Sequence, residues 1–115
     1  MTIFRLFLIT AFGVIAVYTA IVISSHGWNL LPVFFGDIGS LNWSGQFNLD
    51  FLGFLVMSGL WVAWRHEFSP AGIALGLAGA FGGMLFMSAY LFVVSIKAGG
   101  NIEALLLGRH ARGAI

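Results

Sequence analysis

The chain has 115 residues, of which 60% are hydrophobic and only 8% are charged. Soluble domains are about 45–50% apolar and about 25% charged, so this composition excludes an ordinary soluble domain and a disordered chain. A net charge of +1 without a basic cluster argues against nucleic-acid binding. Cysteine is absent, which excludes disulfides and thiol nucleophiles. The composition indicates one integral membrane domain over residues 1–115, with the lipid bilayer as its first partner.

The first apolar run, residues 6–23, contains eighteen residues and no charge. As a helix it would be about 27 Å long, close to the thickness of a bilayer's hydrocarbon core. Eighteen apolar residues are long for a signal peptide, and no clear cleavage site follows. We therefore expect a retained transmembrane helix.

The connection that follows, residues 24–46, is not a polar loop. It contains an apolar stretch around Pro32, flanked by Trp28 and Trp43. Tryptophan prefers the headgroup level of a membrane, and the apolar stretch is too short to span. An interfacial or re-entrant segment is expected here.

Two further apolar runs follow, residues 47–64 and 71–96. Ser69 and Pro70 form a typical helix start, so the two runs are expected to be antiparallel helices joined by a tight turn. The last run would be about 39 Å long as one helix, so it must tilt or project past the hydrocarbon core. A short interfacial helix over residues 102–107 is expected after it. The fold class is thus all-α and polytopic, with three transmembrane helices.

The orientation of these helices is ambiguous in the sequence. Three complete crossings would put Arg5 and Arg65 on one side of the membrane, and Lys97, Arg109 and Arg112 on the other. With two cations on one side and three on the other, the positive-inside rule does not determine the orientation. The lack of Lys and Arg in residues 24–46 favours export of that loop and an N-terminus inside the cell.

The third apolar run carries a stripe of glycines. Spacings of 4, 3 and 4 residues place them on one face of a continuous helix: Gly72, Gly76, Gly79 and Gly83. Small residues let membrane helices approach closely. The partner is predicted to be another helix of the same chain, with a second copy or a different subunit as the alternatives.

Asp50 lies about one turn inside the second apolar run, close to Asn48. Ionisable groups within a span are costly and are candidates for a functional site. Lys97 could pair with Asp50, and Tyr90 could line the same crevice, which defines a candidate polar site. The alternative is that Asn48 or Asp50 caps the helix.

No motif for catalysis or for a cofactor is found, and no catalytic residue is predicted. A metal site needs ligands that converge. His26 and His66 are expected at helix ends on opposite sides of the membrane, and His110 lies in the C-terminal tail. No metal or cofactor is therefore expected.

The second half of the chain contains several distinctive residue runs: Gly45-Gln46-Phe47-Asn48-Leu49-Asp50-Phe51, Leu60-Trp61-Val62-Ala63-Trp64-Arg65, Phe68-Ser69-Pro70, Ala98-Gly99-Gly100 and Leu105-Leu106-Leu107-Gly108. With these runs the chain resembles a family of small, uncharacterised bacterial multi-pass membrane proteins. The resemblance implies three helices in the bacterial inner (plasma) membrane. It implies no activity and assigns no catalytic residue.

The sequence thus favours a non-enzymatic accessory or assembly subunit of a membrane complex, acting as a homo-oligomer or beside another membrane subunit. One alternative is an oligomeric small transporter or channel that uses Asp50. A second alternative is a membrane enzyme directed at a lipid or a quinone, with its ligand near Asn48, Asp50 or Lys97.

Overall fold

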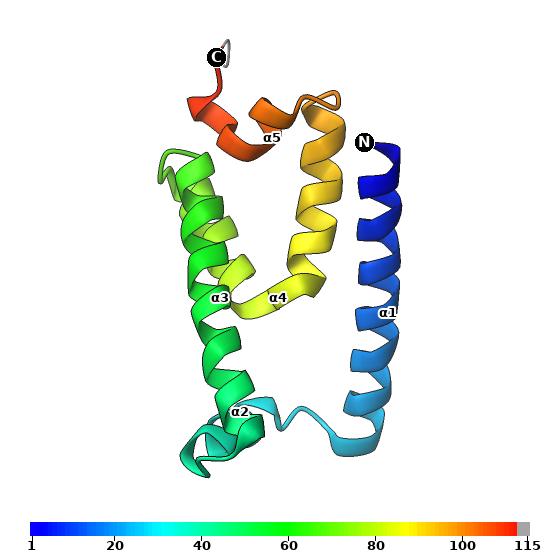
Figure 1. Ribbon diagram of the computed structural model, residues 1–115, viewed down its shortest axis with the longest axis vertical. Coiled ribbons are helices and arrows are strands. Elements are labelled where there is room, and N and C mark those ends of the chain that lie inside the picture. Colours follow the sequence, from blue (N-terminus) through cyan, green and yellow to red (C-terminus); the bar gives the residue numbers. More distant parts are fainter. Residues whose placement is uncertain (113–115) are drawn as a thin grey trace.

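The computed structural model describes residues 1–112, and every regular element in that range is a helix (Figure 1). Three helices are long and apolar enough to cross a membrane. This confirms the expected all-α polytopic fold. The elements are α1 (Thr2–His26), α2 (Leu30–Gly39), α3 (Trp43–Arg65), α4 (Pro70–Lys97), α5 (Ile102–Leu107) and a 3-10 turn η1 (Gly108–His110).

Polar side chains cap three of the helices as their sequences suggest. The side chain of Ser69 accepts a hydrogen bond from the backbone N–H of Gly72, with Pro70 at the first helical position. Asn101 caps α5 in the same way. The cap of α3 is Asn42, and the helix begins at Trp43, four residues before its expected start. Asn48 and Asp50 therefore lie inside α3, and the alternative that either one caps the helix is wrong.

The connection between α1 and α3 contains the short helix α2, which lies across the first turns of α3 (Figure 1). Ten residues form a helix of about 15 Å, too short to span a bilayer. Gly45 permits the close approach, because a Cβ atom there would collide with the backbone carbonyl of Asp37.

Helix α4 is broken at Gly83. This residue has φ 58° and ψ −144°, a conformation that glycine adopts far more readily than other residues. The first half runs beside α3 to about the middle of the molecule, and the second half returns to the end where α4 began (Figure 1). Each half is about 20 Å long. The expectation of one continuous tilted span over residues 71–96 is therefore wrong.

Side chains of α3 cover this break. A Cβ atom on Gly83 would lie 3.4 Å from the ring of Phe51 and 3.5 Å from a methyl group of Leu55. Non-helical backbone at membrane depth is tolerated where protein buries it. Packing from α3 thus supplies part of the cover that an interrupted helix needs.

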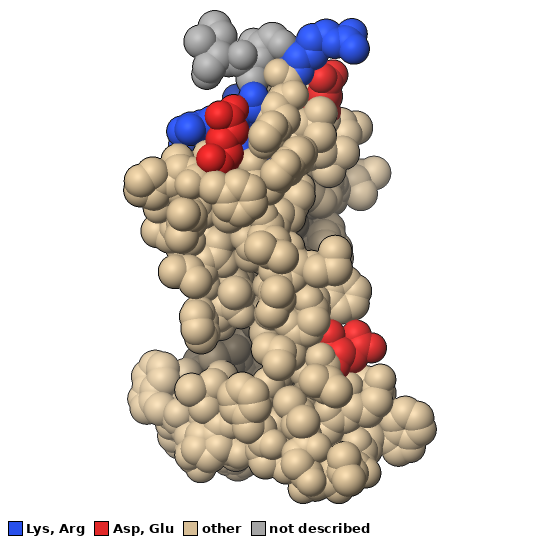
Figure 2. Space-filling model, turned by 90° about the vertical axis from the view of Figure 1, so that its left-hand side faces the viewer, with Lys and Arg blue, Asp and Glu red and all other residues tan. Residues whose placement is uncertain are grey.

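The break brings the two ends of the described chain together. Arg5, in the first turns of α1, donates hydrogen bonds to the hydroxyl and the carbonyl of Ser95, near the end of α4. The expectation that the N-terminal and C-terminal segments lie on opposite sides is therefore wrong. All Lys and Arg residues gather at this end (Figure 2). We call it the cationic end; its residues are Arg5, Arg65, Lys97, Arg109 and Arg112.

Three of the four stripe glycines pack within the chain. Gly72, Gly76 and Gly79 are buried, and Gly76 faces Gly59 of α3. A Cβ atom on either residue of this pair would lie 2.6 Å from the carbonyl oxygen of the other. Gly83 does not continue the stripe, because it forms the break.

Candidate functional site

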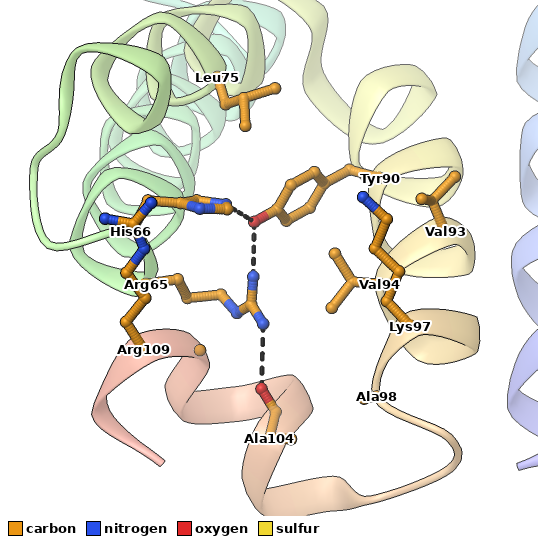
Figure 3. A pocket seen from close by; sticks show the side chains of 11 residues that line it. Arg65, His66, Leu75, Tyr90, Val93, Val94, Lys97, Ala98, Ala104 and Arg109 are labelled. Carbon is orange, nitrogen blue, oxygen red and sulfur yellow. Dashed lines mark hydrogen bonds between the residues drawn. The ribbon is translucent and has the colours of Figure 1, made fainter. Parts of the chain in front are cut away.

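Arg65 ends α3 and is almost fully buried, with 5% of its surface exposed. Its Nε donates to the carbonyl of Leu105 at 2.7 Å, and Nη2 donates to the carbonyl of Ala104 at 3.0 Å. Its Nη1 donates to the hydroxyl of Tyr90 at 2.7 Å (Figure 3). The last carbonyls of a helix lack partners within the helix. Arg65 therefore holds the end of α5 against α3 and the second half of α4.

The charge of Arg65 has only neutral partners among these contacts. Two backbone carbonyls and one phenol satisfy its donors, but none of them carries a negative charge. Buried charges are normally paired or neutralised, because burial removes their hydration. Arg65 thus gives this end of the molecule a positive potential that its hydrogen-bond partners do not cancel.

Tyr90 connects Arg65 to His66. Its hydroxyl accepts from Arg65 and lies 2.7 Å from Nε2 of His66. Because the hydroxyl already accepts one hydrogen bond, it is free to donate its own hydrogen to a neutral His66; this places the ring proton of His66 on Nδ1. Burial and the nearby charges of Arg65, Arg109 and Lys97 lower the pKa of His66 below its ordinary value. The neutral imidazole fits that hydrogen-bond direction.

A pocket of about 580 Å³ opens beside this network (Figure 3). Lys97 at the end of α4 and Arg109 in η1 add two exposed cations to it. Apolar side chains of Leu75, Val93 and Val94 form much of the remaining wall. No Asp or Glu is among the described residues that line it. A concave site with three formal cations and no carboxylate attracts an anion.

The C-terminal segment forms one wall of this pocket and is held by two tryptophans of α3. Trp61 Nε1 donates to the carbonyl of Leu106 at 3.1 Å. The ring of Trp64 stacks on that of His110, with 4.0 Å between the ring centres. Gly108 passes so close to Arg65 that a Cβ atom would collide with the Arg65 carbonyl. These contacts position Ala104, Gly108 and Arg109 around the pocket.

The structure separates the four residues of the expected polar site into two groups. Tyr90 and Lys97 both line the pocket at the cationic end. Asn48 instead donates to the carbonyl of Phe34 at 3.1 Å and ties α3 to α2. Asp50 is exposed on α3, within two residues of Asn48. The break at Gly83 causes this separation, because it returns Tyr90 and Lys97 to the end opposite α2.

The sequence predicts Arg65 and His66 on the side of the membrane opposite Lys97 and Arg109. That placement is wrong, because all four residues line one pocket. A signal was present in the tandem glycines Gly82 and Gly83 within an apolar run, since glycine pairs are frequent sites of sharp helix kinks. Within residues 1–112, no group of three or more His, Asp or Glu side chains is placed to hold a metal ion.

Comparison of the chain with protein-family models, with curated proteins and with solved structures finds no match. The pocket at the cationic end is therefore the basis of the proposed function.

Proposed function

We propose that the chain is a small, non-enzymatic integral membrane protein that binds an anionic group in the pocket at its cationic end. The observation that carries this proposal is Arg65, a buried guanidinium with only neutral partners, beside Lys97 and Arg109 in a pocket whose described lining has no carboxylate. A bound anion would supply the missing negative charge. Since Tyr90 is already hydrogen-bonded to Arg65 and His66, we assign the network a binding role.

The proposed location is the bacterial inner membrane, with the cationic end in the cytoplasm. Lys and Arg are enriched on the cytoplasmic side of membrane proteins. All five Lys and Arg residues of the chain are at this end, and α2 and its flanking turns have none. The pocket would then face the cytoplasmic leaflet and the solutes on that side.

Inorganic phosphate is a suitable first probe for the site. The protein is placed in nanodiscs of zwitterionic lipid, and phosphate binding is measured by calorimetry for the unmodified chain and for a Lys97→Gln/Arg109→Gln double variant. Removing two cations that contact the anion should weaken binding about tenfold or more. Arg112→Gln is the matched control, because Arg112 is a cation at the same end that does not line the pocket. Equal affinity in the double variant and the control would contradict the proposal.

A second candidate role, as a subunit of a membrane assembly, is favoured by the surface of α1. Only 6% of the apolar window of this helix is buried within the chain. In the half of α1 nearer α2, large side chains such as Val17, Tyr18 and Ile21 are exposed. A second copy or a different membrane subunit could cover them. Native mass spectrometry after gentle extraction tests this role: a stoichiometric complex supports it, and a monomer with bound lipid only contradicts it.

A further inference from the structure

An apolar groove lies next to the cationic pocket. It has a volume of about 250 Å³ and runs between α1 and the second half of α4. Its walls are formed by Leu8, Ile9, Phe12, Ser88, Ala89, Phe92 and Val93. The one polar side chain among them, Ser88, donates its hydroxyl hydrogen to the carbonyl of Leu85. The groove therefore presents an apolar surface.

The groove and the pocket share Val93, which lines both. Val93 is one turn before Lys97 on α4, and Figure 3 shows the two side chains beside each other on this half of the helix. Along α4, residues 88–93 lie about 6–13 Å farther from the cationic end than Lys97 does. Val93 thus forms the edge between the pocket, which carries the cations, and the apolar groove, which lies farther from the cationic end.

This order of charge and apolar surface matches the order of parts in a phospholipid, with the phosphate at the membrane surface and the acyl chain below it. We propose that the pocket and groove together bind one glycerophospholipid of net negative charge. Its phosphate would lie among Lys97, Arg65 and Arg109, and one acyl chain would lie along the groove. This inference rests on the proposed anion-binding function and names its ligand.

The headgroup is expected to lack a cationic group. Besides Lys97 and Arg109, the neighbourhood contains Arg5, one turn before Leu8, which bonds only to the neutral hydroxyl and carbonyl of Ser95. A choline or ethanolamine group would add a positive charge next to these cations. A glycerol headgroup would not, so a phosphatidylglycerol-type lipid fits better than a zwitterionic one.

Native mass spectrometry of the protein from equimolar phosphatidylglycerol and phosphatidylcholine with identical chains tests the ligand class. One retained phosphatidylglycerol per protein, enriched about fivefold or more over phosphatidylcholine, is the expected result. Equal retention of the two lipids would overturn the inference. This measurement uses the unmodified chain and does not depend on the folding of a variant.

An Ala89→Phe variant tests the groove separately from the pocket. Ala89 is exposed and lines the groove, so a phenyl ring there would occupy the space proposed for the acyl chain. Ala78→Phe is the matched control, because Ala78 is an exposed alanine in the first half of α4, outside the groove. Lipid retention should fall about tenfold in Ala89→Phe alone, while calorimetric binding of inorganic phosphate in lipid-free detergent stays unchanged in both variants.

The outcomes separate the two proposals. If phosphate binding depends on Lys97 but lipid retention does not respond to Ala89→Phe, the site binds free phosphate and the lipid inference fails. If neither phosphate nor lipid binding responds to Lys97→Gln/Arg109→Gln, the proposed anion-binding function fails with it.

Discussion

The two ends of the molecule are built in different ways. At the cationic end, the start of α1, the end of α3, both ends of α4 and the short helix α5 meet. Hydrogen bonds of Arg65 join α3 to α5 and to the second half of α4, and those of Arg5 join α1 to α4. The buried apolar cluster of the chain lies beside this network and includes Val62, Tyr90, Val94 and Leu105. At the opposite end, α1 leads through a short connection to α2, which packs on α3, and large side chains such as Trp28 and Trp43 are exposed.

The contrast shows how one apolar chain can order two ends by different means. Directional hydrogen bonds hold the cationic end, where Arg65 donates to the carbonyls of Ala104 and Leu105 in α5. Close helix contact through Gly45 and single hydrogen bonds of Asn42 and Asn48 hold the opposite end. Substitutions at the cationic end should therefore disturb a network, whereas those elsewhere should act through local packing.

The largest expected effect concerns topology and is all-or-none. The chain has no cysteine, so single cysteines can be introduced at Thr2, Ile102 and Ser40. In sealed vesicles of one orientation, an impermeant maleimide should label Thr2→Cys and Ile102→Cys from the same side, and Ser40→Cys from the other. A continuous α4 would put Thr2 and Ile102 on opposite sides. Labelling of Thr2→Cys and Ile102→Cys from opposite sides would contradict the gathering of both segments at the cationic end.

Arg65→Met is expected to produce the largest loss of stability. The change leaves the carbonyl of Leu105 without its side-chain donor and breaks the link from α3 to Tyr90. The free energy of unfolding in detergent should fall by about 3 kcal/mol, since hydrogen bonds to charged groups contribute about 1.5–3 kcal/mol each. Arg112→Met, an exposed cation at the same end, should change it by less than about 0.5 kcal/mol. Equal stability of the two variants would argue against the network.

Gly59→Ala and Gly53→Ala provide a matched pair within α3. A methyl group at Gly59 would lie 2.6 Å from the backbone oxygen of Gly76, whereas nothing lies within 4 Å of the same position at Gly53. The first change should lower the free energy of unfolding by about 1–3 kcal/mol, as overpacking does. The second should leave it within about 0.5 kcal/mol. Chemical denaturation in detergent measures both, and a reversed order would disprove the α3–α4 contact.

The smallest expected effect is on pH dependence. Burial and the charges of Arg65, Arg109 and Lys97 lower the pKa of His66 in the folded state. Its contribution to stability is therefore complete above the unfolded pKa of about 6.5 and is lost as pH falls through the folded pKa. For one proton, the free energy of unfolding cannot change by more than about 1.4 kcal/mol per pH unit. His66→Asn should remove this part of the pH dependence of unfolding, whereas His26→Asn at the opposite end serves as the control. Identical pH profiles for the unmodified chain and His66→Asn would exclude this role.

A bound anion should have the opposite effect on the pKa of His66. Negative charge beside His66 favours its protonated form, so a bound anion should raise the pKa of His66 back toward its ordinary value.

Much of the fold follows from apolarity and helix-end signals. The run at residues 6–23 locates α1, and the Ser69–Pro70 start places the beginning of α4 at the correct residue. Helix boundaries are less accurate where polar residues continue a helix, as at residues 43–46 before the expected start of α3, because hydropathy measures composition and not backbone hydrogen bonds. The same limit applies to Gly83, whose apolar neighbours look continuous although its backbone dihedrals are not helical.

The site was only half predictable for the same reason. Tyr90 and Lys97 were correctly placed on one helix, but their partners depend on the direction in which that helix leaves Gly83. A single residue with positive φ places Tyr90 beside Arg65 and not beside Asp50. The periodicity of apolar residues does not indicate the direction in which the helix leaves Gly83.

The break at Gly83 also bears on how the chain is inserted during synthesis. A helix that turns back at mid-depth can enter the bilayer from the side on which it was made, so neither Lys97 nor α5 has to be carried across. In the proposed orientation, the exported part is the short segment around α2, which has no Lys or Arg and only one Asp. Translocation would thus require the transfer of very little charge, and every basic residue of the protein could remain where the ribosome delivered it.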